Sequence, residues 1–168
     1  MGVDADYDKR RGFYRSFMNV SLGTRLEMGQ SLNSLIKSCT FNGRNCLNSE
    51  FFGVLSTPEY GNCFTFNSNI SSAADREAGQ RVASMVGPNT GLSLVLFVDT
   101  NNYMPSTVSQ TRGARVAIHP SDVTPLMAET GMEVSPTSLT SISIIEVSES
   151  HPRPVPHRPV SHQYPSLR

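Results

Sequence analysis

The cysteines constrain this 168-residue chain more than any other residues, because there are three of them. Cys39 and Cys46 lie at the two ends of CTFNGRNC, and Cys63 lies in YGNCFTFN. If these cysteines form disulfides, an odd number leaves one thiol without a mate inside the chain. The alternative is a cytosolic protein with free thiols, which is disfavoured because CTFNGRNC has no metal-ligand spacing and no nearby histidine.

Charge and hydropathy exclude several classes of protein. Lys and Arg total 14, and Asp and Glu also total 14, so we expect no nucleic-acid partner. The longest apolar run, GLSLVLFV, has eight residues, whereas a membrane-spanning helix needs roughly 20. The charged N-terminal sequence also lacks the apolar region of a signal peptide. We therefore expect neither a signal segment nor a transmembrane segment in this chain.

Two short motifs indicate a secreted setting. Asn19-Val20-Ser21 and Asn69-Ile70-Ser71 are N-glycosylation sequons, which makes Asn19 and Asn69 candidate glycosylation sites. Motifs of three residues also arise by chance, so each sequon alone is weak evidence.

For the first half of the chain, the sequence pattern predicts few helices or strands. Residues 1–30 are charged and then polar, and we expect a mobile terminus around Asp4 and Asp6. Apolar spacing predicts one short helix over 30–38. The pair Asn42-Gly43 then predicts a turn.

The second half favours strands. CFTFN alternates aromatic and small polar residues and predicts a strand from Cys63. Residues 72–88 fit either a helix or a surface loop. Segments 91–99, 113–119 and 139–147 are rich in β-branched residues and predict strands of one sheet. The fold class is therefore α+β, mainly antiparallel β, with a short N-terminal helix.

The C-terminal segment 148–168 has a different composition. It contains five prolines, at 152, 154, 156, 159 and 165, which block helices and central strands. We expect this Pro- and His-rich tail to be extended or disordered.

These motifs, in this order, carry a family resemblance. LIKSCTFNGRNC, YGNCFTFN, GLSLVLF, GARVAIHPSDVTP and GMEVSPTSLTSISI together resemble the extracellular region of the degenerin, epithelial sodium channel and acid-sensing channel family, in its acid-sensing-channel-like branch. The resemblance runs from about residue 32 to residue 146. The paired cysteines followed by YGNCFTFN and ARVAIH are its most specific part.

The resemblance implies an answer to the cysteine count. In this family the first two cysteines, here Cys39 and Cys46, bond to each other. The third, here Cys63, bonds to a cysteine upstream of the region that this chain covers. We therefore expect the chain to be a fragment, with 1–30 at the end of the finger region, 31–147 in the palm and β-ball, and 148–168 as the tail.

The resemblance also implies a function for the full-length parent. The parent would be a subunit of a sodium-selective, amiloride-sensitive-type channel at the plasma membrane, assembled with other subunits as a homo- or heterotrimer. This chain would lie on the extracellular face, would contain no pore or cofactor, and would meet the membrane only through segments absent here. A soluble secreted β-rich binding module without channel activity is the alternative.

The same resemblance argues against gating by protons. Acid-sensing members carry a carboxylate in the strand matching GLSLVLF, where this chain has Ser93. The following loop, YMPSTVSQTRGAR, has no carboxylate to form a proton-binding pair. The stimulus could instead be a peptide or mechanical load, the channel could stay open, or the subunit could rely on its partners for gating.

The remaining candidates are weaker. His119 could sense pH, although a histidine at a strand end is more often solvated or bonded to backbone. The tail histidines 151, 157 and 162 lack ligand spacing, so we expect no metal site there. Arg153, Pro156 and Pro159 fit a ligand for polyproline-binding domains, but such domains are cytosolic. No catalytic constellation is present, so we expect no enzymatic activity.

Overall fold

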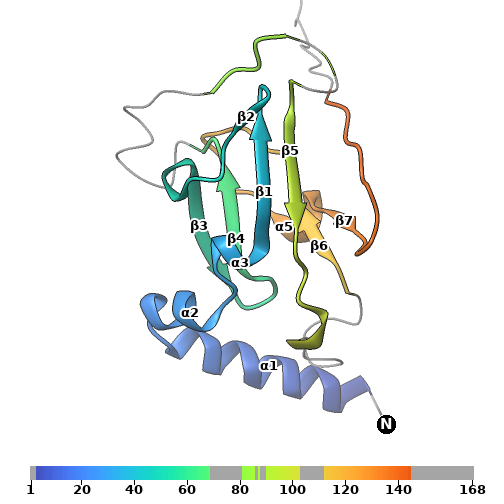
Figure 1. Cartoon of the computed structure of the whole chain (residues 1–168). Coiled ribbons are helices and arrows are strands. Elements are labelled where there is room, and N and C mark those ends of the chain that lie inside the picture. The colour runs from blue at the N-terminus through green and yellow to red at the C-terminus, as the bar shows by residue number, and fades with distance from the viewer. Residues whose placement is uncertain (1–2, 69–80, 86, 88–89, 103–111, 145–168) are drawn as a thin grey trace, which may run out of the picture.

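A computed structural model describes residues 3–68, 81–85, 87, 90–102 and 112–144 (Figure 1). The helices are α1 Val3–Asn19, α2 Leu22–Met28, α3 Leu32–Leu35 and α5 Met127–Thr130, with short 3-10 helices η1 Ser49–Phe51 and η2 Thr100–Asn102. The strands are β1 Ile36–Phe41, β2 Arg44–Asn45, β3 Phe52–Thr57, β4 Gly61–Phe66, β5 Leu92–Leu96, β6 Ala114–Val116 and β7 Met132–Val134.

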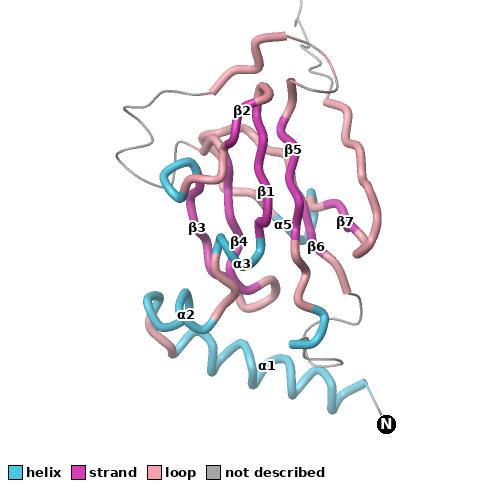
Figure 2. The backbone as a smooth tube through the Cα atoms, in the orientation of Figure 1, coloured by secondary structure: helices cyan, strands magenta, loops and turns pink. Residues whose placement is uncertain are grey.

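The described strands pair only in antiparallel fashion, in three groups. One sheet has the order β2-β1-β5, and β3 with β4 and β6 with β7 form two-stranded pairs. Figure 2 shows α1 crossing the end of the strands opposite the β1–β2 turn. This arrangement confirms the predicted α+β class with antiparallel strands.

The core lies between the three-stranded sheet and the β3–β4 hairpin. Its most buried residues are Ile36, Cys39 and Cys46, with exposed fractions of 2%, 1% and 4%. Partly buried apolar side chains pack around them, namely Leu32, Leu35, Phe41, Leu47, Phe51, Phe52, Phe66, Leu94 and Leu96. Because removal of apolar surface from water drives folding, this small cluster holds the two sheets together.

The N-terminal segment is more regular than the sequence pattern suggested. The mobile terminus expected around Asp4 and Asp6 is instead part of the 17-residue helix α1. Phe13 and Phe17 lie one turn apart on it with ring centroids 6.0 Å apart, and Tyr14 donates a hydrogen bond to Glu59 at 3.0 Å. The contact between the two rings and the hydrogen bond to the β3–β4 turn stabilise this helix, whose mean hydropathy is low.

The helix predicted over 30–38 ends early. Helix α3 begins after Ser31, whose hydroxyl accepts a hydrogen bond from the Ser34 amide, and it ends at Leu35. From Ile36 the chain is the strand β1, because the backbone pairs with β5 some 60 residues later, with Ile36 opposite Leu96. Long-range pairing has overridden the local helical spacing.

The three predicted C-terminal strands do not form one sheet. Segment 91–99 contains β5, which pairs with β1, and segment 113–119 contains β6, which pairs with β7. Residues 139–144 of the third predicted strand are not in a strand, and Leu139 is 95% exposed. A strand needs a hydrogen-bonding neighbour, and among the described residues β6 pairs with β7 and no strand pairs with 139–144.

Candidate functional site

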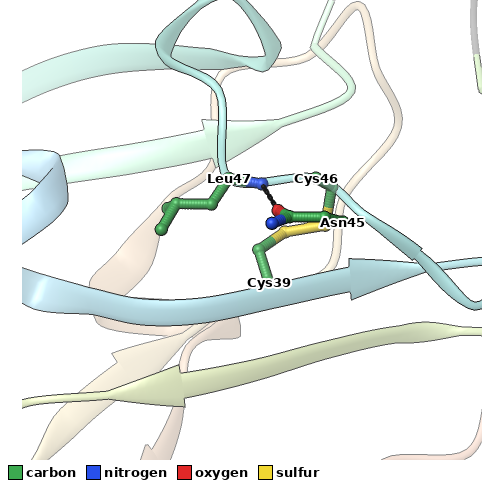
Figure 3. Close-up of a disulfide and its surroundings, with 4 residues drawn as sticks. All are labelled: Cys39, Asn45, Cys46 and Leu47. Atoms are coloured by element: carbon green, nitrogen blue, oxygen red, sulfur yellow. Dashed lines mark hydrogen bonds between the residues drawn. A yellow bond between two sulfur atoms is a disulfide. The ribbon is translucent and has the colours of Figure 1, made fainter.

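The site that the sequence singles out is the cysteine-bearing turn. Cys39 in β1 and Cys46 just after β2 are joined by a disulfide, with Cα atoms 5.0 Å apart (Figure 3). The Cys46 amide also donates to the Cys39 carbonyl at 3.0 Å. Beside them the Asn45 side chain accepts a hydrogen bond from the Leu47 amide at 2.8 Å, which fixes the exit of the chain from the turn.

The turn inside this disulfide forms where Asn42-Gly43 predicted it. Asn42 and Gly43 both have positive φ, 52° and 69°, and they connect Phe41 to Arg44 across the hairpin. A two-residue hairpin turn with positive φ at both positions matches the right-handed twist of the flanking strands. The disulfide and the turn therefore fix the same hairpin, one covalently and one by backbone preference.

Cys63 lies apart from this disulfide. It is in β4 opposite Leu55 of β3, is half-buried, and is a free thiol. Burial raises the pKa of the Cys63 thiol, and a hydrogen bond with Thr57 opposes the shift. Since the thiolate is the reactive form, Cys63 in this fold is less reactive than an exposed cysteine.

The structure describes some of the other predicted residues. Asn19 is the exposed last residue of α1, so its amide is accessible to modification. His119 has Nδ1 2.8 Å from the Pro120 carbonyl, which matches the backbone-bonded alternative. Ser93 is an exposed residue of β5, opposite Thr40. The structure thus brings Cys39 and Cys46 together and leaves the other candidates apart.

Several predicted residues lie outside the described residues. These are the second sequon at Asn69, most of the segment 72–88, the loop 103–111, the tail histidines 151, 157 and 162, and the Pro-rich motif at Arg153, Pro156 and Pro159. Their predictions, like the boundaries proposed for the segments 1–30, 31–147 and 148–168, stay predictions.

Two apolar grooves flank the β3–β4 hairpin. One of about 280 Å³ lies between the hairpin and α2–α3, where Asn62 donates to the Leu26 carbonyl at 2.9 Å. The other, of about 240 Å³, lies between the β3–β4 turn and α5. Within the described ranges, no group of three His, Cys, Asp or Glu side chains is placed to hold a metal ion.

Sequence reasoning missed the role of Arg115. Its guanidinium donates to the Met127 and Ala128 carbonyls at 2.7 and 3.0 Å and forms an ion pair with Glu133 at 3.3 Å. It also lies 5.8 Å from the centre of the Tyr60 ring. Arg115 thereby connects β6, β7, α5 and the hairpin turn. The sequence carries no signal for this, because a basic residue in a short strand is ordinarily solvated.

The chain is similar to known proteins of one family. The family described as amiloride-sensitive sodium channel matches residues 4–164. The epithelial sodium channel subunit gamma-2 of Xenopus laevis is 33% identical over 150 residues, which is 89% of this chain and 21% of that protein. Degenerin deg-1 of Caenorhabditis elegans is 38% identical over 96 residues, which is 57% of this chain and 11% of that protein.

A disulfide-closed hairpin on a small antiparallel α+β framework is typical of an extracellular protein and not of a cytosolic enzyme. The chain belongs to the amiloride-sensitive sodium channel family. It spans about a fifth of the length of the gamma-subunit relatives that it matches. These relatives are epithelial sodium channel subunits and degenerins, so the predicted family is confirmed, whereas the acid-sensing-channel-like branch stays a prediction.

The helices can also be compared with the dimensions of a membrane. Among the described residues, no helix is both long enough and apolar enough to cross the bilayer.

Proposed function

We propose that this chain is part of the extracellular region of a sodium channel subunit, whose full-length form conducts sodium across the plasma membrane. The observation that carries the proposal is the family match over residues 4–164. In the parent this region would transmit extracellular stimuli to a pore formed by other segments. The subunit would assemble with further channel subunits as a homo- or heterotrimer.

The disulfide supports an extracellular position. A buried disulfide is typical of chains that fold in an oxidising compartment, where Asn19 would also be accessible to glycosylation. Cys63 is half-buried in a strand of the same framework. We propose that its partner in the parent is a cysteine outside this chain, as the family resemblance implies.

We further propose that the parent does not open through a pair of acidic residues next to β5. Ser93, an exposed residue of β5, lies where acid-sensing members carry a carboxylate. Two close carboxylates raise each other's pKa and can bind protons near neutral pH, and a hydroxyl cannot replace one of them. A peptide, a mechanical load or partner subunits would then control opening, or the channel would be constitutively open.

The test is electrical recording from oocytes that express the full-length parent, alone and with a gamma subunit. Recorded at rest, under mechanical load and with applied peptides, the oocytes should show an inward sodium current that amiloride blocks, with uninjected oocytes as the control. Acidification of the bath is expected to evoke no large transient current.

Two outcomes would contradict these proposals separately. A large transient current on acidification would overturn only the gating proposal. Absence of an amiloride-blocked current under every subunit combination and every stimulus, with the protein recovered from the medium, would favour the soluble secreted binding module.

A further inference from the structure

Residues 81–85 are exposed, but two asparagine side chains, one at the end of a strand in each of two sheets, form hydrogen bonds with their backbone. Asn67, just after β4, accepts a hydrogen bond from the Arg81 amide at 2.8 Å and donates to the Arg81 carbonyl at 3.0 Å. Asn42, in the β1–β2 turn, donates to the Val82 carbonyl at 3.0 Å and accepts from the Ser84 amide at 3.2 Å. Each side-chain amide thus bonds the segment through both a donor and an acceptor.

The two asparagines share an unusual backbone conformation. Asn42 and Asn67 have φ of 52° and 63°, in the left-handed region that non-glycine residues seldom adopt. Asparagine tolerates this region better than most residues, because its short polar side chain bonds to nearby backbone. Both amides bond to the same segment. Since both side chains are neutral, these four hydrogen bonds do not depend on pH near neutrality.

The Arg81 side chain adds a third attachment. Its guanidinium carbon lies 3.6 Å from the centre of the Phe51 ring, at the end of η1. A guanidinium at this distance from an aromatic face is attracted by the ring electrons and stacks on its plane. The far end of the segment is held as well, because Thr90 donates from its hydroxyl to the Met85 carbonyl at 2.7 Å.

The attachment points lie at the junction of the two sheets. Asn42 directly follows Phe41, and Asn67 directly follows Phe66, and these two rings pack with centroids 5.5 Å apart. Phe66 also packs on Phe52 of β3. In Figure 1 the segment passes the end of the strands at which the β1–β2 turn lies. The segment therefore bridges the three-stranded sheet and the β3–β4 hairpin beside their aromatic contact.

We propose that residues 81–85 are a latch that holds the three-stranded sheet and the β3–β4 hairpin together. Release of the Asn42 and Asn67 amides frees the segment and loosens the Phe41–Phe66 junction. The fold thus contains a built-in conformational control point at one end of its sheets. This proposal does not rest on the channel function, because it concerns contacts within the described chain.

Trypsin cleavage after Arg81 tests the latch in the full chain. The Arg81 carbonyl is bonded and its side chain is stacked, so the bond to Val82 is cleaved only when the latch opens. Asn67→Gly keeps the left-handed backbone and removes both hydrogen bonds. We expect cleavage after Arg81 to become about 5- to 30-fold faster, the ratio for two hydrogen bonds of ordinary strength.

Matched controls separate latch release from general unfolding. Thr137→Gly also places glycine at a left-handed position, with φ of 58°, but away from the latch, and should leave cleavage after Arg81 unchanged. Cleavage after Arg115, within β6 and outside the two sheets that the latch joins, is measured in the same digest and should not change in Asn67→Gly. Equal acceleration at Arg115 and Arg81 would overturn the proposal, as would an unchanged rate at Arg81.

Two more variants test the stacking contact and the link to the junction. Arg81→Lys keeps a trypsin site but loses the flat stacking on Phe51, so it should also be cleaved faster. In a Phe41→Leu background the effect of Asn67→Gly should shrink, because the junction is already loosened. Full additivity of these two substitutions would overturn the coupling of the latch to the sheets.

Discussion

At the scale of single residues, Cys39 and Cys46 contribute both a covalent link and buried surface. They are two of the three most buried residues of the core cluster, although their loop is short. The entropy model for disulfides assigns a smaller stabilisation to short loops than to long ones. Because the core is small, even the stabilisation from this short disulfide loop is a large share of the net free energy of unfolding.

Replacing both cysteines, as Cys39→Ala with Cys46→Ala, should lower the free energy of unfolding by about 2.5 kcal/mol from loop entropy alone. The lost sulfur contacts add to this value. Urea unfolding of the double variant and of the unsubstituted chain measures the difference in free energy of unfolding. Mass spectrometry after alkylation without reduction should find one free thiol in the unsubstituted chain. Three alkylated cysteines would refute the disulfide.

Cys63 should be alkylated slowly in the folded chain at neutral pH, since burial raises its pKa and lowers the thiolate fraction. The rate should rise with pH and should rise further in denaturant. The disulfide-linked dimers expected from an unpaired thiol should therefore form slowly on non-reducing gels. Equal alkylation rates in folded and denatured protein would contradict the half-buried position.

The same thiol links stability to pH. The folded chain keeps the Cys63 proton to a higher pH than the unfolded chain does. Its contribution to stability is present below the ordinary thiol pKa and is lost as pH rises through the raised pKa. The Cys63→Ala variant should lose this part of the alkaline decline and thus serves as the control.

At the scale of elements, the β1–β2 hairpin is set by its own sequence. The turn at Asn42-Gly43 needs positive φ at both residues, and these two residue types adopt it at low cost. The strand β1 is different, because its length depends on pairing with β5, which comes after β2, β3 and β4 in the chain. Local backbone preference therefore determines the turn of this hairpin, and long-range pairing determines the length of its first strand.

Gly43→Ala should destabilise the chain by about 1–2 kcal/mol, the cost of a left-handed backbone for a residue with a Cβ. Gly12→Ala is the matched control, because a Cβ at either position meets no atom within 4 Å. Gly12 is in the helix α1, where alanine should stabilise by about 0.5–1 kcal/mol. Urea midpoints measure both, and a shift of the same sign in the two variants would contradict this account.

At the scale of the whole molecule, the small core and the open sheet edges matter most. Among the described strands, β5 pairs only with β1, so its other edge is available to another chain. Val95, within β5, and Phe97, just beyond its end, are 56% and 50% exposed. A chain with such an edge and a small core is marginally stable and prone to associate.

The chain should therefore form larger species as its concentration rises in size-exclusion chromatography with light scattering. Val95→Lys should reduce this association, because a charged side chain on an edge strand opposes pairing with a second chain. The control is Asn101→Lys, which changes an exposed residue outside β5 and should leave association unchanged. A single monomeric species at every concentration would contradict the prediction.

The sequence by itself determined the features that depend on a few neighbouring residues. The turn at Asn42-Gly43 and the strand around Cys63 follow from local backbone preferences and alternation of side chains, and both occur in the structure. The family also follows from motifs in linear order. These features survive because their physical causes act over a few bonds.

Tertiary structure alone decided which strands pair and which segments are regular. Ile36 belongs to a strand because Leu96 lies opposite, whereas 139–144 has no strand beside it among the described residues and is not a strand. Helix α1 gains contacts through Tyr14 and Glu59, 45 residues apart in the chain. Such choices depend on competition between distant partners for the same backbone hydrogen bonds and the same buried surface, and no short window of sequence contains that competition.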